Sequence, residues 1–200
     1  MTMSEIKLDV DQASELKAAF RREDWTNEEI KMLCERKGFL ADVRQALRGR
    51  AVITQVEHVI DCDADPFNPW TNDGFTIEEH QKGGQWKFDP KQVEFFLSSG
   101  QKDGKVIEGN KLRKELAKKS VFNANVLDYL LAHPELIPDE WKTDGNGNTR
   151  YIFFWGTVYR NRDGSLYVRY LYWSGGGWSW SDSWLDGGWN GSNPAALRAS

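Results

Sequence analysis

Hydrophobic and polar residues follow a helical period in some parts of this chain and a strand period in others. Apolar residues recur at helical spacing in residues 12–50, after Asp89, in residues 110–118 and after Asn123, which predicts helices there. Residues 151–160 and 166–173 are rich in β-branched and aromatic side chains, which predicts strands, and the β-branched residues 51–60 predict a strand or a buried connector. The pattern therefore predicts an α+β protein that ends in a C-terminal antiparallel β-meander.

Residues 12–50 are predicted to form a helical extension. Thr26 and Glu29 fit a capping box, in which the hydroxyl accepts from the Glu29 amide while the Glu29 side chain reaches back. Gly38 is expected to break or bend the helical run. The second piece is expected to turn these apolar residues inward: Phe39, Leu40, Val43 and Leu47.

Three short helices are predicted in the middle of the chain. Asp89-Pro90 is an N-cap followed by Pro at the first helical position, and Gly100 is expected to stop that helix. Asn123 can cap another helix, which Pro134 ends. The residues expected to face the core are Val93, Phe96, Leu97, Leu112, Leu116, Val126, Leu127, Leu130 and Leu131.

Polar turns separate the strands of the C-terminal part. Residues 144–148 and 161–164 contain the Asp, Asn and Gly residues that turns favour. Residues 151–160 are apolar or aromatic on both faces, which predicts a strand covered on both sides. Trp178 and Trp180 are two residues apart, so in a strand both indoles would point to one face.

Composition limits the class of protein. The net charge of −4 disfavours nucleic acid as the main partner. Trp25-Thr26-x-Glu28-Glu29 is faintly similar to the start of Myb-type DNA-binding domains, but eight basic and six acidic residues in 20–50 favour a solvated amphipathic face. We expect a soluble, cytoplasmic protein without membrane insertion, since no secretory signal precedes Gln12, the most apolar helical stretch is too short to span a bilayer, and Cys34 and Cys62 form no CxxC pair.

The segment 173–193 has an unusual composition. It contains five Trp, five Ser, six Gly, two Asp, two Asn and one Leu, and it lacks Lys, Arg, Glu and Gln. Trp supplies large, stiff contact area, and Ser, Gly, Asp and Asn supply small adaptable polar contacts, which is how antibody-type binding loops are built. A flexible linker would not need Trp, so the segment is interpreted as a recognition surface.

The genetic code gives the same segment a second property. Ser, Gly, Asp and Asn account for 15 of its 21 residues, and all four are reachable from the Asn codons AAC and AAT by replacing one or both adenines. Trp and Leu have codons with no obligatory adenine. A process that mutates only adenines would therefore vary the first set, spare the second and never create a stop codon.

At this point the chain resembles a family. Residues 153–160, 163–173, the spacing Trp178-x-Trp180-x-x-x-Trp184-Leu185-Asp186-x-x-Trp189 and the ending 193–197 look like the variable proteins of diversity-generating retroelements. They are most similar to an uncharacterised bacterial group, which residues 127–138 also resemble. The Gly-Gly-Ser-Trp stretch of better-known members is absent from this chain.

The resemblance implies a C-type-lectin-like, ligand-binding domain at 56–200 after a helical extension at 1–55, with a variable region at about 172–196. The implied activity is recognition of a protein or glycan target, without catalysis or a cofactor. The implied scaffold is Trp178, Trp180, Trp184, Leu185 and Trp189. The implied variable, ligand-binding positions are Ser174, Gly175, Gly176, Gly177, Ser179, Ser181, Asp182, Ser183, Gly187, Gly188, Asn190, Gly191, Ser192 and Asn193.

Two alternatives remain open. Aromatic side chains beside Asp and Asn also suit an invariant carbohydrate-binding module. A metal-dependent enzyme is the third interpretation, because residues 58–65 with 78–80 hold metal-ligand side chains at close spacing. Since no recognised zinc spacing is present, a surface acidic turn is favoured and no metal is expected. The residues concerned are His58, Asp61, Cys62, Asp63, Asp65, Glu78, Glu79 and His80.

Overall fold

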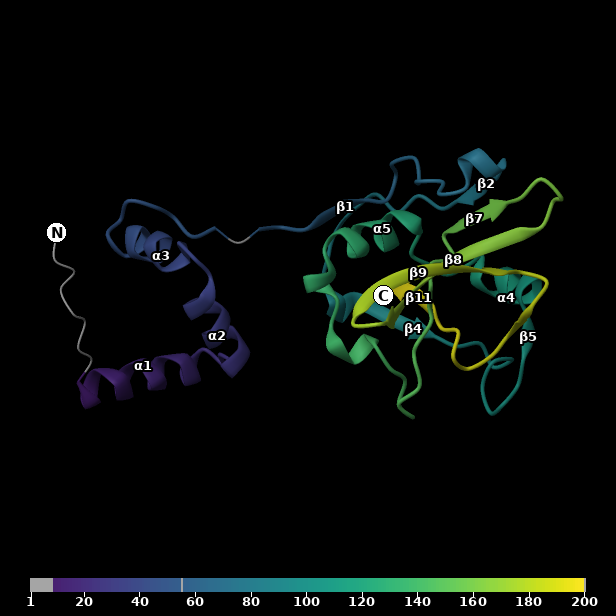
Figure 1. Cartoon of the computed structure of the whole chain (residues 1–200). Helices are drawn as coiled ribbons and strands as arrows, with labels where there is room; N and C mark the ends of the chain where they lie inside the picture. The colour runs from purple at the N-terminus through teal and green to yellow at the C-terminus, as the bar shows by residue number, and fades with distance from the viewer. Residues whose placement is uncertain (1–8, 55, 200) are drawn as a thin grey trace. The chain divides into compact units, whose positions relative to one another are not determined.

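The computed structural model describes residues 9–54 and 56–199. The chain divides into two compact units, Met1–Val56 and Glu57–Ser200. The first unit contains helices and the second contains helices and mixed sheets, so the protein is α+β (Figure 1).

The described residues of the first unit form three helices: α1 (Val10–Arg22), α2 (Asn27–Glu35) and α3 (Phe39–Leu47). The predicted capping box at Thr26 and Glu29 is confirmed, and Asp9 with Gln12 forms another on α1. Gly38, at φ +86°, separates α2 from α3 as predicted. The expected inward packing of α3 is wrong for Leu40 and Leu47, which are 53% and 84% exposed, because residues 9–54 contain no buried residue that could form a core with them.

The prediction of a strand or a buried connector at 51–60 is mostly wrong, because the described residues before Ile60 are exposed or partly exposed. Only β1 (Val59–Asp61) forms, and it pairs with β3 (Gln85–Lys87). The apolar residues before β1 are exposed, and Gln55 lies outside the described residues, as do residues 1–8 of the predicted extension. β-branched residues form a strand only where a neighbouring strand pairs with them, and here β3 reaches only three residues.

The main sheet of the second unit has the order β2-β7-β8-β6-β11-β4. β7 and β6 pair with successive parts of one edge of β8, and β9 pairs with the opposite edge. Among the described strand pairs of this sheet, β6 with β11 is parallel and the rest are antiparallel, so the predicted antiparallel meander holds for β7, β8 and β9 but not for the chain end. A small sheet pairs β5 (Ile107–Glu108) with β10 (Gly188–Trp189). The main-sheet strands are β2 (Thr76–His80), β4 (Val93–Phe96), β6 (Ile152–Phe153), β7 (Thr157–Arg160), β8 (Leu166–Ser174), β9 (Gly177–Trp184) and β11 (Ala195–Arg198).

The predicted helix after Asp89 is wrong. A single 3-10 turn, η2 (Pro90–Gln92), is followed by β4, because β11 offers Val93 to Phe96 a complete antiparallel ladder. The predicted strand at 151–160 is interrupted, since Gly156 approaches the Asn123 backbone so closely that an added Cβ would lie 2.9 Å from the Asn123 Cα. The other 3-10 turns are η1 (Thr71–Asp73), η3 (Pro134–Leu136) and η4 (Asp139–Trp141).

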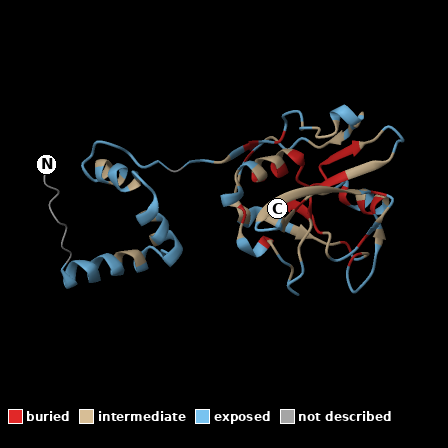
Figure 2. Cartoon of the chain, in the orientation of Figure 1, coloured by how far each residue is buried: buried red, intermediate tan, exposed pale blue. Residues whose placement is uncertain are grey.

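Two helices pack on the main sheet through separate hydrophobic clusters. Helix α5 (Ala124–Ala132), capped by Asn123 as predicted, contributes Leu127 and Leu130 to one cluster. Helix α4 (Gly109–Leu116) contributes Leu112 and Leu116 to the other, also as predicted. Consecutive residues of β6 and β11 alternate between the two clusters, so the sheet is covered on both faces, and the buried residues concentrate there (Figure 2).

Candidate binding surface on the β8–β9 hairpin

The Trp-rich segment folds into the longest hairpin of the sheet. β8 and β9 pair from Tyr167 with Trp184 to Ser174 with Gly177. Gly175 and Gly176 join them with φ values of +59° and +84°, the left-handed conformations that a tight two-residue turn requires. Alternation then divides the hairpin into two faces of different chemistry.

One face, called the α5 face here, holds the tryptophans. Trp178 and Trp180 lie on this face together, as predicted. Both pack against the hydrophobic cluster that contains Leu127 and Leu130 of α5. The Arg169 guanidinium lies 4.2 Å from the centre of the Trp180 ring, which permits a cation–π contact. These two indoles therefore anchor the hairpin to the hydrophobic cluster on the α5 side of the sheet.

Asp182 also lies on the α5 face, paired across the strands with Arg169. Arg169 is 1% exposed and forms a bidentate ion pair with Asp128 of α5, at 3.1 and 2.7 Å. Burial raises the pKa of the Asp182 carboxyl, while nearby Arg169 acts in the opposite direction. Asp182 is therefore separated from the other predicted ligand-binding residues of β9.

The opposite face, called the serine face here, carries Ser179, Ser181 and Ser183. Ser179 pairs with Tyr172, and Ser181 pairs with Tyr170. All five side chains belong to partly exposed residues. This face therefore combines tyrosine rings with small hydroxyl groups, the composition typical of adaptable protein-recognition surfaces.

Tyr151 joins the two tyrosines of the serine face. Its ring centre lies 5.5 Å from that of Tyr170 and 5.9 Å from that of Tyr172, within the range for favourable aromatic pairs. Sequence reasoning did not single out these three tyrosines as site residues. The alternation in 166–173 places Tyr170 and Tyr172 on one face, but nothing in the sequence indicates that Tyr151 completes the cluster.

The loop 190–193 adjoins the tyrosines. Its main-chain carbonyls bond to the rest of the fold, and within the loop the side-chain oxygens of Asn190 and Asn193 accept from the amides of Ser192 and Asn190. The Gln101 side-chain amide donates to the carbonyl oxygens of Asn190 and Asn193, at 3.0 and 2.9 Å. The Tyr151 amide donates to the Ser192 carbonyl at 3.3 Å. We call the surface formed by the serine face, its tyrosines and this loop the Tyr–Ser surface.

The loop between β9 and β10 is anchored in the same way. The amide of Asn110 donates to the Leu185 carbonyl, and that of Gly109 donates to the Gly187 carbonyl, both at 3.2 Å. Gly187 and Gly188 lie in this loop and in β10, and a side chain at Gly188 would have to displace Val106, since its Cβ would lie 2.7 Å from the Val106 Cγ1.

The predicted scaffold residues differ in burial. Leu185 is 0% and Trp189 is 1% exposed, whereas Trp184 is 46% exposed at the end of β9. Trp189 packs on Phe153 and Trp155, with ring centres 4.3 and 4.7 Å away. Trp189 and Leu185 can therefore anchor the loops on either side of β10, and Trp184 contributes much less buried area.

An open trough of about 630 Å³ borders the Tyr–Ser surface. Asn190, Gly191 and Ser192 form one of its walls. The turns 102–104 and 144–148 also line it, and Asp144 stabilises the second turn by accepting hydrogen bonds from the amides of Asn146 and Asn148. The trough presents mainly Asn, Asp, Ser and Lys side chains, which suits a polar ligand group.

The metal-ligand side chains at 58–65 and 78–80 take part in structural contacts. Glu78 pairs with Arg160 and Glu79 pairs with Arg113. The Asp61 and Asp63 carboxylates accept main-chain hydrogen bonds from Asp63 and Gly84. Within residues 9–54 and 56–199, no three His, Cys, Asp or Glu side chains are grouped so that they could hold a metal ion.

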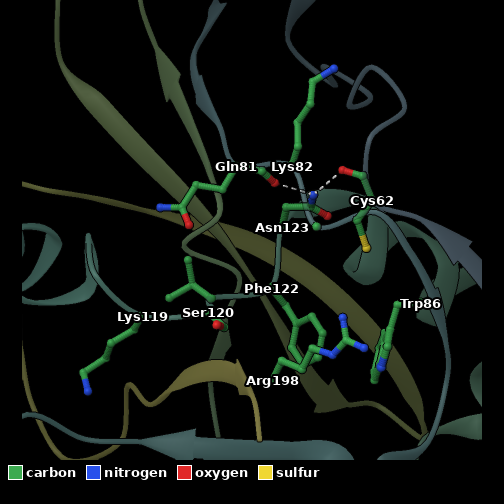
Figure 3. Close-up of a pocket in the computed structure, with 11 residues that line it drawn as sticks. Cys62, Gln81, Lys82, Trp86, Lys119, Ser120, Phe122, Asn123 and Arg198 are labelled. Atoms are coloured by element: carbon green, nitrogen blue, oxygen red, sulfur yellow. Dashed lines mark hydrogen bonds between the residues drawn. The ribbon is translucent and has the colours of Figure 1, made fainter. Parts of the chain in front are cut away.

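A second pocket, of about 310 Å³, lies beside Cys62, Trp86 and Phe122. The Asn123 amide forms its polar centre and donates to the carbonyls of Cys62 and Gln81, at 2.8 and 2.9 Å (Figure 3). The side chain of Arg198 points toward Trp86 in this view, whereas the side chains of Lys82 and Lys119 point away. These cations do not converge on one point, so the pocket offers no defined anion site.

No family model, curated protein or solved structure matches the chain. None of the helices in the described residues is long and apolar enough to cross a membrane.

Proposed function

We propose that this chain is a ligand-binding protein whose C-terminal surface is diversified by adenine-directed mutagenesis from a retroelement, and that it recognises targets without catalysis. The supporting observation is the way in which the predicted variable segments are held. β9 is held by a main-chain ladder, and the loops that contain Gly187 and residues 190–193 accept hydrogen bonds through their main-chain carbonyl groups. Main-chain acceptors remain when side chains change, so β9 and Gly187 tolerate variation. In the loop 190–193 the side-chain oxygens of Asn190 and Asn193 also accept from the amides of Ser192 and Asn190, so a change at either Asn removes one of these bonds.

The packing of the predicted scaffold residues supports the same proposal. Trp189, Leu185, Trp178 and Trp180 have codons that need not contain adenine, and they pack into the two clusters or against them. The serines alternate with these anchors along β9. Mutagenesis restricted to adenines would therefore change the serines of the Tyr–Ser surface and spare these four anchors, although Asp182, whose codon contains adenine, would also vary on the α5 face.

The turn glycines also fit this proposal. Gly175 and Gly176 have positive φ values, which Gly accepts freely and which Asn and Asp accept better than other residues. Gly, Asn and Asp all belong to the set of residues reachable from the Asn codons. We propose, on the resemblance, that the Glu57–Ser200 unit is C-type-lectin-like, with β9 and its following loops as the ligand surface.

The genetic test is to sequence the DNA around the gene. We expect a non-coding repeat that matches the codons for residues 172–196 except at adenines, close to a gene for a reverse transcriptase. A locus without this repeat, or mismatches spread over all four bases, would refute diversification. Binding of one and the same glycan by all natural copies would instead favour the invariant carbohydrate-binding module.

The protein test compares two display libraries of equal size. The first replaces Ser179, Ser181 and Ser183 with the residues reachable from AAC, and the second does the same at Trp178, Trp180 and Leu171 of the α5 face. We expect most clones of the first library and few of the second to resist proteolysis, and only the first to yield binders to a panel of unrelated proteins. If equal fractions of both libraries resisted proteolysis, the α5 face would not be the scaffold.

A further inference from the structure

β9 is an edge strand of the main sheet. Among the described strands it pairs with β8 alone, and none of its eight residues is buried (Figure 2). An edge strand presents a row of main-chain donors and acceptors that another extended chain can continue. What β9 can bind therefore depends on which of its main-chain groups point outward.

The main chain of β9 alternates between β8 and the open edge, because hydrogen-bonded and non-hydrogen-bonded residue pairs alternate in an antiparallel ladder. The Leu185 amide donates to the Leu166 carbonyl at 2.9 Å, so that pair is hydrogen-bonded. Steps of two residues along the register from this pair lead to Ser183, Ser181 and Ser179. The main-chain groups of the three serines therefore bond to β8.

The main-chain groups that point outward belong to Trp178, Trp180 and Asp182. The residue opposite Asp182 shows the same alternation, since the Arg169 carbonyl accepts from the Phe154 amide on the far edge of β8, at 3.1 Å. Within the described residues, no hydrogen bond from another residue reaches the amide or the carbonyl of these three outward residues. The open edge thus offers pairs of N–H and C=O groups about 7 Å apart.

The other two edges of the main sheet carry features that discourage pairing. β2 has a register shift after Ile77 and contains two Glu residues, and β4 is four residues long and contains one Glu. Bulges, charges and short length are the means by which proteins protect open edges. β9 is eight residues long and lacks Lys, Arg, Glu and Pro, and its one charged residue, Asp182, lies opposite Arg169.

An extended polypeptide matches the open edge of β9. Its N–H and C=O groups repeat with the same spacing, whereas a glycan or a nucleic acid has no such repeat. Its side chains would alternate as well, one set beside the serine face and the other beside Trp178 and Trp180, which are partly exposed. Main-chain bonds would then supply affinity, and the serine face would supply selectivity.

We propose that β9 binds its target as an added β-strand, so that the ligand is an extended polypeptide segment of about five residues with alternating apolar and polar side chains. The apolar side chains cover Trp178 and Trp180, and the others contact the serine face. The choice of β9 as the ligand surface rests on the proposed function, and the mode of binding rests on the open edge. Because the outward main-chain groups persist when the serines vary, diversification changes selectivity and keeps the docking geometry.

The first test uses full-length clones from the library that varies Ser179, Ser181 and Ser183. The probes are short linear peptides of random sequence and a set of immobilised glycans. We expect clones that bind peptides in which apolar residues recur at every second position. Clones that bind glycans and no peptide would overturn the added strand and leave the proposed function in place, whereas a library without any binder would refute both.

Hydrogen exchange of one such clone tests the geometry. In the free chain the amides of Ser179 and Ser181 should exchange slowly, and those of Trp178, Trp180 and Asp182 should exchange fast. The bound peptide should slow the three outward amides about tenfold or more and leave the serine amides nearly unchanged. Unchanged outward amides would overturn the proposal. Slowing that needs only a higher concentration of the chain would also overturn it, because a second copy would then occupy the edge.

A pair of variants in the same clone isolates one outward amide. Asp182→Pro removes the N–H that faces the open edge, and an edge strand accepts Pro where that N–H makes no ladder bond. Asp182→Ala removes the same carboxylate and keeps the N–H. We expect Asp182→Pro to bind the selected peptide about tenfold or more weakly than Asp182→Ala, with equal circular dichroism. Equal affinity of the two folded variants would contradict the added strand, and if Asp182→Pro does not fold, the exchange rates decide alone.

Discussion

Gln101 and Asn190 are 89 residues apart in the chain, yet the buried amide of Gln101 donates to the Asn190 carbonyl at 3.0 Å. The same nitrogen donates to the Asn193 carbonyl, and the amide oxygen accepts from the Ser98 backbone at 3.1 Å. One side chain thereby ties the turn at 98–101 to the loop 190–193. This contact depends on the position of the loop backbone and not on the side chains that the loop presents.

Replacing Gln101 with Leu should therefore weaken the attachment of the loop 190–193 to the turn at 98–101. The substitution removes two donors and one acceptor at a site that is 1% exposed, which should cost about 1–3 kcal/mol of unfolding free energy. Chemical denaturation would measure this loss, and hydrogen exchange at the Tyr151 amide, which donates to Ser192, would localise it. The control, Ser192→Ala, changes the surface of the same loop and should leave both measurements near wild type.

Trp184, at the end of β9, and Trp189, in β10, should differ in their contribution to stability. Trp189→Ala removes a ring that is 1% exposed and should cost roughly 3–5 kcal/mol. Trp184→Ala removes a ring that is 46% exposed, so about half of that loss is expected. Thermal or denaturant melts compare the two variants directly, and equal losses would mean that Trp184 is held by contacts that its exposure does not reveal.

Local hydrogen bonds explain which parts of the fold could be predicted from the sequence. Thr26, Asn123 and Asp144 each bond to an amide within four residues, and the caps and turn that they form were all predicted. The strand β4 was missed because its partner, β11, lies a hundred residues later. The spacing of Val93, Phe96 and Leu97 predicted a helix, because the pairing with β11 that makes this segment a strand is not visible in the local sequence.

The candidate site was predictable to a similar degree. Alternation placed Trp178 and Trp180 together correctly, because both lie on one strand. The same rule separates Asp182 from Ser181 and Ser183, but the restricted residue set grouped all three as ligand-binding. Gln101 and Tyr151 reach the surface only through the folded sheet and its loops, so no local pattern could identify them.

The two cysteines should differ in reactivity. Burial raises the pKa of the Cys62 thiol to about 11, and the negative charge of Asp63 acts in the same direction, so almost no thiolate is present near neutral pH. Cys34 is exposed. At about pH 8, iodoacetamide should label the wild-type chain once and the Cys34→Ser variant hardly at all, with mass spectrometry as the readout. Adding urea should expose Cys62, and rapid labelling of the folded variant would contradict the burial of this thiol.

His80 should make the second unit sensitive to acid. The imidazole lies between the Thr157 hydroxyl, at 2.9 Å, and the Cys62 carbonyl, at 3.2 Å, and the Thr157 oxygen also accepts from the Ala124 amide at the start of α5. Burial is the largest influence on the pKa of His80 and lowers it below the ordinary value of 6.5, although the hydrogen bond to Cys62 acts in the opposite direction.

A lowered pKa in the folded state means that the unfolded chain binds the proton more tightly. The contribution of His80 to stability is therefore fully present above pH 6.5 and is lost as the pH falls through the lower pKa of the folded state. Urea denaturation at a series of pH values should show the unfolding free energy of the second unit declining over this interval. The His80→Gln variant keeps hydrogen-bonding groups but cannot titrate, so its decline should be smaller. His133→Gln, at a partly exposed helix end, serves as the matched control and should follow the wild type. An unchanged slope in His80→Gln would assign the acid sensitivity to the carboxylates instead.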